Sequence, residues 1–159
     1  MADRPKQLLT LAIVHQHPKV LMALKKTGFG AGNINGFGGK VEEGEEIEAA
    51  AKREMREEAG VEIVEMEKIG IITFEFAGKE LLREVHIFKV REFQGEPKES
   101  EEMKPEWFFI DEIPIMKMWP ADKFWLPFFL KDRKFRAKFL YGEGNAILEK
   151  DIQEVSFLQ

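Results

Sequence analysis

The sequence predicts an α/β fold, in which a mixed β-sheet is covered by one helix on each side. Two observations carry this prediction. Short apolar runs typical of buried strands recur along the chain, and two segments of helical composition, Glu45–Ala59 and Asp122–Leu130, separate groups of strands. The chain has 159 residues, of which 44% are apolar, and no repeat or linker divides it. We therefore expect one domain over residues 1–159 with a substantial core.

The first expected elements are two strands and a glycine-rich segment. Leu8–Val14 is an apolar run and is predicted to be a buried strand. His17-Pro18-Lys19 indicates a turn, and Val20–Leu24 indicates a second strand. Residues 27–44 then contain seven glycines, a density that indicates tight turns and a main chain in close contact with a neighbouring group.

A helix and three strands are expected next. Glu45–Ala59 contains strong helix formers without Gly or Pro, and Gly60 follows at the position where a helix ends. Apolar runs predict strands at Val61–Val64, Ile69–Phe76 and Val85–Val90.

The last third of the chain is predicted to alternate between loops and regular elements. Lys98–Glu106 is expected to be an acidic loop, and Trp107–Ile110 a short strand. Asp122–Leu130 predicts an aromatic-rich helix, and the alternation in Phe135–Tyr141 predicts a late strand.

Composition excludes several classes of protein. The net charge of −5 argues against a surface that coats nucleic-acid polymers. The absence of cysteine excludes disulfides, thiolate nucleophiles and cysteine zinc sites, and favours a reducing compartment. Leu8–Val14 is too short for a signal core or a membrane span. We expect a cytoplasmic protein without membrane contact; the lack of a recognisable organelle address leaves nuclear and mitochondrial pools open.

Three carboxylates are predicted to share one face of the first helix. Glu54, Glu57 and Glu58 are spaced at i, i+3 and i+4, so their like charges repel one another. Mg²⁺, or alternatively Mn²⁺, would remove this repulsion, because such hard cations prefer carboxylate oxygens. Arg53, one turn before Glu57, could hold that carboxylate in position. A solvated acidic face is the alternative interpretation of this segment.

The residues around this helix favour the metal site over the solvated face. They match the pattern G-x5-E-x7-R-E-U-x-E-E-x-G-U, where U is a bulky aliphatic residue, and so the segment resembles the box of Nudix hydrolases. The matching positions are Gly39, Glu45, Arg53, Glu54, Met55, Glu57, Glu58, Gly60 and Val61. The resemblance implies a Nudix α/β/α sandwich with a mixed sheet, in which a loop–helix–loop holds metal against a diphosphate.

Segments outside the box narrow the resemblance. They are similar to the animal MutT-homologue enzymes, which are oxidised purine nucleoside triphosphatases, from about Leu9 to Val155. The segments that carry this similarity include Lys25-Lys26, Gly28–Gly32, Asn35–Val41, Phe74-Glu75-Phe76, Val85-His86, Glu102-Met103, Trp107-Phe108 and Met118-Trp119-Pro120.

The resemblance implies a phosphate and metal site. Its implied metal ligands are the carboxylates of Glu54, Glu57, Glu58 and Glu102 and the carbonyl of Gly38. Glu58, alone or through a water that it orients, would supply the base, with Glu57 and Arg53 as its catalytic partners. Lys25 and Lys40 would meet the triphosphate. Taken alone, Glu102 belongs to a charge cluster that indicates only solvent exposure.

The resemblance also implies a base pocket. Asn35 can donate to and accept from a purine edge, and Trp119 can stack on a base. The full set of implied substrate-binding residues is Thr10, Lys25, Phe29, Asn35, Phe37, Gly38, Gly39, Lys40, Phe74, Trp119 and Asp122.

The chain departs from this pattern around the pocket. The relatives carry two adjacent acids after Trp-Pro, whereas this chain carries Ala121-Asp122. With Asp122 as the remaining, ionised acid, we expect oxidised guanine triphosphates to be preferred over 2-oxoadenine triphosphate, and room at Ala121 for an alkyl group on the purine. Arg83 replaces an apolar pocket-edge residue, and Asn33-Ile34 replaces a basic–aromatic pair.

The sequence therefore predicts a monomeric, Mg²⁺-dependent enzyme that converts modified purine nucleoside triphosphates to monophosphate and pyrophosphate. Two alternatives remain at this point. One is a Nudix hydrolase for a dinucleotide or nucleotide sugar, and the other is a nucleotide-binding protein without catalysis.

Overall fold

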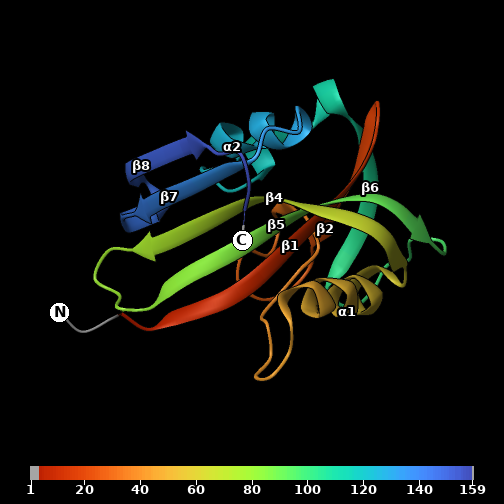
Figure 1. The fold of residues 1–159 in the computed structure, drawn as a ribbon, viewed down its shortest axis with the longest axis horizontal. Helices are drawn as coiled ribbons and strands as arrows, with labels where there is room; N and C mark the ends of the chain where they lie inside the picture. The colour runs from red at the N-terminus through yellow and green to blue at the C-terminus, as the bar shows by residue number, and fades with distance from the viewer. Residues whose placement is uncertain (1–3, 159) are drawn as a thin grey trace.

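The computed structural model describes residues 4–158, which form one twisted mixed sheet and two α-helices (Figure 1). The strands are β1 (Lys6–Gln16), β2 (Lys19–Lys25), β3 (Ile34–Asn35), β4 (Glu62–Phe76), β5 (Leu82–Gln94), β6 (Met103–Phe109), β7 (Phe135–Tyr141) and β8 (Ile147–Glu154). The helices are α1 (Ile47–Ala59) and α2 (Asp122–Leu130), with single 3₁₀ turns at Ile110–Glu112, Ile115–Lys117 and Glu143–Asn145. Within the described residues, no helix is long and apolar enough to cross a membrane.

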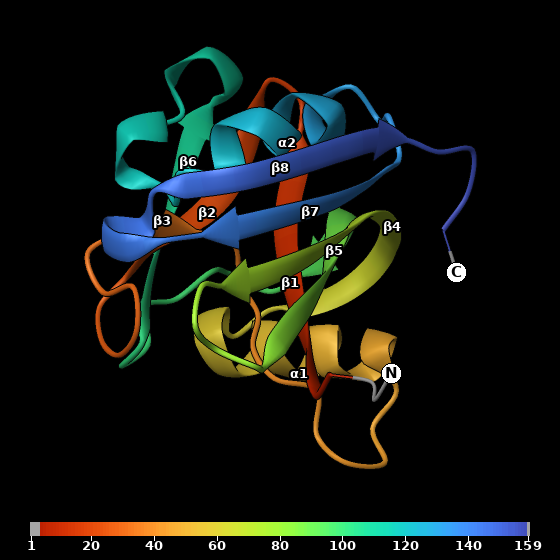
Figure 2. The ribbon, with the colours of Figure 1, turned by 90° about the vertical axis from the view of Figure 1, so that its left-hand side faces the viewer.

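The sheet is mixed because two of its pairings are parallel. Its order is β3-β2-β1-β5-β4-β7-β8. Strand β6 lies outside this path and pairs with β2. β1 runs parallel to β5, and β4 runs parallel to β7, while the remaining pairs are antiparallel. Figure 2 shows β8 as the outermost strand beside β7.

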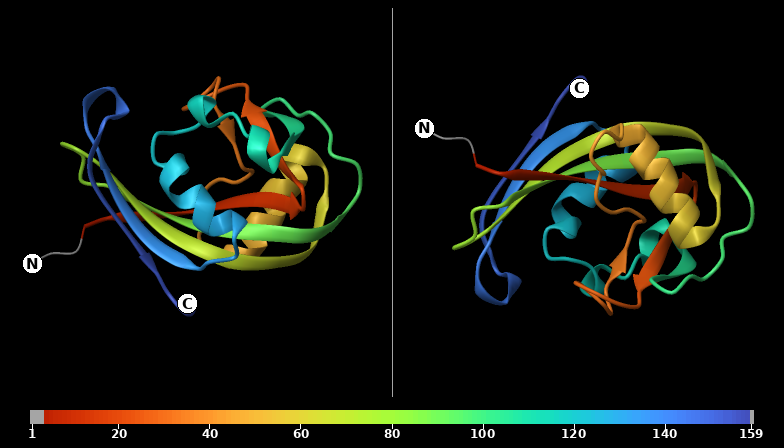
Figure 3. Two further views of the ribbon diagram at one scale, coloured as in Figure 1. Left: turned by 90° about the horizontal axis from the view of Figure 1, so that it is seen from above. Right: turned by 90° about the horizontal axis from the view of Figure 1, so that it is seen from below.

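The two helices cover opposite faces of this sheet, with β1 and β5 between them (Figures 1 and 3). Alternation along the strands builds the two layers: Ile13 of β1 packs with α2, whereas Ala12 and Val14 pack with α1. Trp125 and Phe129 of α2 are buried in the hydrophobic cluster between this helix and the sheet. The predicted α/β/α sandwich is confirmed.

Several element boundaries differ from the sequence prediction. The separate strands expected at Val61–Val64 and Ile69–Phe76 are one strand, β4, whose irregular pairing with β5 between Ile63 and Gly70 interrupts the apolar pattern. Helix α1 begins at Ile47 rather than Glu45, and it ends as expected before Gly60, which has a left-handed φ of 71°.

The acidic loop is shorter than expected. Met103–Glu106 is the first half of β6, because its main chain pairs with β2 from Lys25 to Met22. This strand ends at Phe109, and Ile110 begins a 3₁₀ turn. Strand β8 is not evident in the sequence, because as an edge strand it exposes mainly polar side chains and has no apolar alternation.

Candidate active site

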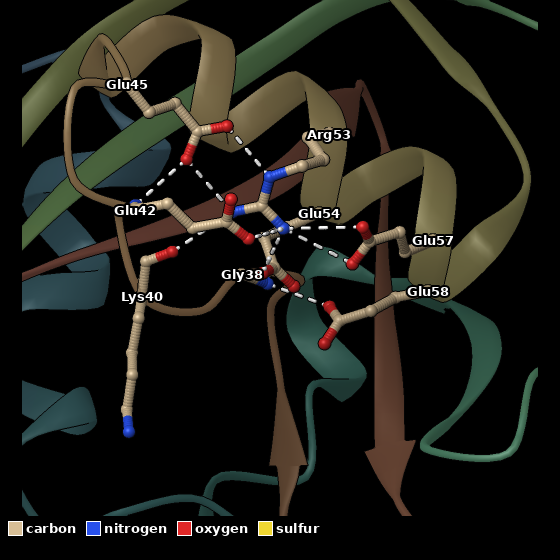
Figure 4. A network of polar contacts seen from close by, with 8 residues as sticks. All are labelled: Gly38, Lys40, Glu42, Glu45, Arg53, Glu54, Glu57 and Glu58. Carbon is tan, nitrogen blue, oxygen red and sulfur yellow. Dashed lines mark hydrogen bonds and ion pairs between the residues drawn. The ribbon is translucent and has the colours of Figure 1, made fainter.

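Arg53 connects helix α1 to the loop that precedes it (Figure 4). Its Nε donates to Glu45 Oε2 over 2.8 Å, and its Nη1 donates to Glu54 Oε1 over 2.9 Å. Its Nη2 also donates to the carbonyl of Lys40 over 3.1 Å. The hydrogen bond from Arg53 is the main reason that the pKa of Glu45 is lowered to about 2. One guanidinium therefore fixes the loop and the carboxylate face together.

Glu58 is the most buried carboxylate of α1, with 5% of its surface exposed. The main-chain N–H of Gly38 donates to Glu58 Oε1 over 2.9 Å (Figure 4). Burial raises the pKa of Glu58 to about 8, with further increases from the charges of Glu54 and Glu102, although the Gly38 hydrogen bond opposes this rise. Burial also raises the pKa of Glu54. The helix thus presents closely spaced carboxylates that favour either protons or a cation.

The glycine-rich loop approaches these carboxylates because it lacks side chains at two positions. A Cβ on Gly39 would lie 2.8 Å from Glu54 Oε1, and a Cβ on Gly38 would lie 1.8 Å from the carbonyl oxygen of Thr10. The loop is bound to β1, since the Thr10 N–H donates to the Gly39 carbonyl over 2.9 Å. Both glycines are therefore required for close approach rather than for unusual dihedral angles.

A cradle of carboxylate and carbonyl oxygens is formed by Glu54, Glu57 and Glu58 of α1 and by the main chain of the Gly38–Gly39 loop. These oxygen donors fit a hard divalent cation. Glu57 is turned toward Arg53, with 3.3 Å between Glu57 Oε2 and Arg53 Nη1. Glu102 lies in the loop before β6, close enough for its charge to raise the pKa of Glu58 and Glu54. Within residues 4–158, no three acidic, histidine or cysteine side chains are arranged as a preformed metal site.

A cavity extends from this carboxylate end toward α2. Lys25, Gly38, Gly39 and Glu58 line one part of it. The other part is lined by the sequence-predicted residues Thr10, Phe29, Asn35, Phe74, Trp119 and Asp122. The structure therefore brings most of the expected phosphate and base residues to one cavity.

The wall of the base end is aromatic. The rings of Phe29 and Trp119 have centroids 5.2 Å apart, and Phe74 stacks on Tyr141 at 5.8 Å with an interplanar angle of 4°. The hydroxyl of Thr10 is buried in this wall without a hydrogen-bond partner. Flat rings with isolated polar atoms suit a planar heterocyclic ligand.

Asp122 lies at the start of α2 and is 7% exposed. Burial raises its pKa to about 7, although the hydrogen bond from the Trp125 indole lowers it. The expectation of a simply ionised Asp122 therefore requires correction, because this carboxyl changes its charge close to neutral pH.

Three expectations about individual side chains differ from the structure. Phe37 is fully buried in the cluster beneath α1 and does not line the cavity, because β-bridge pairing with Ala12 turns it to that face. The Lys40 side chain is exposed and points away from the carboxylates (Figure 4). Ala121 is fully buried in the core against α2 and Tyr141, so the space expected there for an alkyl group is filled.

Other cavity residues were not identified from the sequence. Phe76, Met103, Trp125 and Tyr141 also line it. The period-2 alternation from Phe74 could have predicted Phe76. Tyr141 comes from β7, and its position depends on the parallel pairing with β4, which the sequence does not reveal.

The chain is similar to known proteins over nearly its whole length. The model of the NUDIX domain matches residues 6–129. The chain is 48% identical over 149 residues to the oxidized purine nucleoside triphosphate hydrolase of Mus musculus, covering 94% of this chain and 96% of the relative. The Danio rerio protein of the same name is 48% identical over 152 residues, covering 96% of this chain and 97% of the relative.

A solved structure shows the same fold over nearly the whole chain. The crystal structure of the mutator MutT protein from Bacillus halodurans superposes with a TM-score of 0.83 and 32% identity, covering 92% of this chain and 97% of that one. The sequence pattern, the cradle on α1 and these similarities lead to one conclusion: the chain belongs to the Nudix hydrolase family.

Proposed function

We propose that this protein hydrolyses oxidised or otherwise modified purine nucleoside triphosphates to the monophosphate and pyrophosphate, with Mg²⁺ as its cofactor. The observation that carries the proposal is one cavity with a carboxylate cradle at one end and an aromatic wall with polar groups at the other. The similarity to oxidized purine nucleoside triphosphate hydrolases over nearly the whole chain supports the same substrate class. Such activity would remove damaged nucleotides before they enter DNA.

The carboxylate end of the cavity suits a triphosphate. Mg²⁺ would be held by the carboxylates of Glu54, Glu57, Glu58 and Glu102 and by the Gly38 carbonyl. When bound, it supplies charge neutralisation for the polyphosphate and acidity for an attacking water. Lys25 lines the same end of the cavity as Glu58 and adds a positive charge there.

Glu58 is the residue that we assign to proton transfer. Its buried carboxylate is oriented by the Gly38 N–H and lines the cavity, so it can accept a proton from a water molecule there. Arg53 contacts Glu45, Glu54 and Glu57 but does not line the cavity, and its role is to position those carboxylates.

The aromatic end suits a purine. Trp119 offers a face for stacking, and Asn35 offers both a donor and an acceptor for the base edge. Asp122 adds a carboxyl whose protonation state decides whether it accepts or donates. We further propose that the protein acts as a monomer in the cytoplasm, through one Nudix domain over residues 1–159.

Product analysis with and without Mg²⁺ tests the proposal. Incubation with 8-oxo-dGTP should release 8-oxo-dGMP and pyrophosphate, and EDTA should stop the reaction. Unmodified dGTP serves as the matched control and should be converted more slowly. Exclusive cleavage of dinucleotides or nucleotide sugars would replace the proposal with the other Nudix substrate class, and binding without hydrolysis in Mg²⁺ would identify a catalytically inactive nucleotide-binding protein.

A further inference from the structure

Arg83 places a positive charge on the aromatic end of the cavity. In β5, residues 83, 85 and 87 alternate onto one face, and all three line the cavity. Arg83 is the outermost of this row and lies directly opposite Phe74 in the β4–β5 ladder. It is therefore directed at the base end of the cavity by strand register, whereas Lys25 lies with the carboxylate end.

Two aromatic rings hold the guanidinium of Arg83. Its Cζ lies 5.7 Å from the ring centroid of Phe29 and 5.4 Å from that of Phe76. Phe29 in turn contacts Trp119, so the charged group is continuous with the proposed stacking surface. These distances are within the range of cation–π contacts, which orient a guanidinium without using its N–H donors.

The donors of this guanidinium have no side-chain or main-chain acceptor among the described residues. Among the described residues, Arg83 forms neither an ion pair nor a side-chain hydrogen bond, whereas Arg4, Arg53, Arg56, Arg91 and Arg133 each do so. An arginine carries five N–H donors, and in this position they border the cavity. A ligand in the cavity can therefore supply their acceptor.

We propose that Arg83 is a specificity-determining residue that selects purines with an additional carbonyl or ionised lactam oxygen and rejects purines with a positively charged ring. This inference rests on the proposed function and names the base chemistry within it. An oxygen of partial or full negative charge forms a charge-assisted hydrogen bond with the guanidinium. A ring that carries a positive charge is repelled by the guanidinium.

A charge series of purines tests the proposal. At mildly acidic pH, xanthosine monophosphate carries a largely ionised base, guanosine monophosphate a neutral one and 7-methylguanosine monophosphate a largely cationic one. Titration calorimetry in EDTA measures their dissociation constants without catalysis and without a metal ion. We expect the unmodified protein to bind them in that order, with the two ends separated by about tenfold or more.

Two substitutions at the same position distinguish charge from shape. Arg83→Met fills similar volume without charge and should reduce the separation between the ends to less than about threefold, within the contribution of one charged hydrogen bond. Arg83→Lys retains the charge without the planar fork and should keep the order with a smaller separation. Arg136→Met, at an exposed position on β7 outside this cavity, is the matched control and should leave the series unchanged.

The outcomes separate this inference from the proposed function. Failure of the unmodified protein to bind any of the three monophosphates would overturn both. Binding with the same order and separation in Arg83→Met as in the unmodified protein, at an unchanged melting temperature, would overturn the role of Arg83 alone.

Discussion

The indole N–H of Trp125 donates a hydrogen bond to Asp122 Oδ1 over 2.9 Å, within the first turn of α2. This contact fixes the orientation of Asp122, whose carboxyl is the one that the described residues place at the base end of the cavity. It stabilises the ionised form, but burial has the larger effect and raises the pKa of Asp122 to about 7. A carboxyl in this state can act as an acceptor or a donor within the physiological pH range.

Base preference should therefore depend on pH. Above a pH of about 7, ionised Asp122 accepts from the N–H groups of a guanine edge; below it, the protonated carboxyl can donate to an adenine-type edge. We expect the ratio of kcat/KM for 8-oxo-dGTP to that for 2-oxo-dATP to rise as pH increases through about 7. The ratio cancels pH effects on the catalytic helix that both substrates share.

Asp122→Asn is the matched variant for this measurement. Its amide does not titrate, so its substrate ratio should be independent of pH. A ratio that varies with pH equally in both proteins would assign the effect to another group.

Ala121→Asp should destabilise the protein rather than restore a second carboxyl that recognises the purine. Ala121 is fully buried, and its N–H donates to the Tyr141 hydroxyl over 3.0 Å. An added carboxyl would lack a cationic partner there, and we expect a loss of at least about 2 kcal/mol in unfolding free energy. Urea denaturation measures this loss, with Ala121→Ser as the smaller, uncharged control. A stable variant with increased 2-oxo-dATP hydrolysis would contradict the prediction.

Glu58→Gln should remove activity without weakening the fold. Loss of a base typically costs about 10²–10⁴-fold in kcat, and the amide oxygen can still accept from the Gly38 N–H. With Mg²⁺ absent, the raised pKa of Glu58 means that the native state keeps a proton that the unfolded state loses. Native stability therefore falls as pH rises toward about 8, and this penalty is absent in the variant.

The control for Glu58→Gln is urea unfolding in EDTA at several pH values. The variant should equal the unmodified protein in acid and become the more stable of the two as pH approaches 8. Retained turnover in Mg²⁺ would show that another group accepts the proton.

Trp119→Ala should affect ligand binding far more than stability. Trp119 contacts Phe29 at the cavity wall and is partly exposed, and a stacked base is worth about 1–3 kcal/mol. We expect KM to rise by about tenfold or more, with kcat reduced less. Trp125→Ala provides the contrast, since Trp125 is 1% exposed in the core and its truncation should cost about 3–5 kcal/mol of unfolding free energy. Equal destabilisation by the two substitutions would place Trp119 in the core instead.

The sequence predicted the cradle better than the cavity. Local spacing alone puts Glu54, Glu57 and Glu58 on one face of the helix. Gly39 could be recognised as well, because the close approach of the loop to Glu54 leaves no room for a side chain at this position. Phe37 could not be placed correctly, because its direction follows from a bridge to Ala12 that is distant in sequence. The raised pKa of Asp122 likewise depends on burial by several elements, and no local pattern encodes it.

Removing Asp132 from its ion pair with Lys89 should destabilise the protein, because the buried ammonium would lose its partner. Lys89 is fully buried, its Nζ lies 2.6 Å from Asp132 Oδ1, and it also lies over the Phe129 ring. Asp132→Asn retains a residue that tolerates the left-handed φ of 57° but leaves the buried ammonium without its counter-charge. Because Asp132 is about half exposed, we expect a loss of about 1.5–3 kcal/mol in unfolding free energy, more than for Lys89→Met, which removes the charge itself. Burial lowers the pKa of Lys89, so the native protein loses this proton at a lower pH than the unfolded chain does. The loss of unfolding free energy caused by Asp132→Asn should therefore shrink as pH rises. Urea denaturation of both variants across neutral and alkaline pH measures this, and a larger loss in Lys89→Met would show that the lysine's packing outweighs its charge.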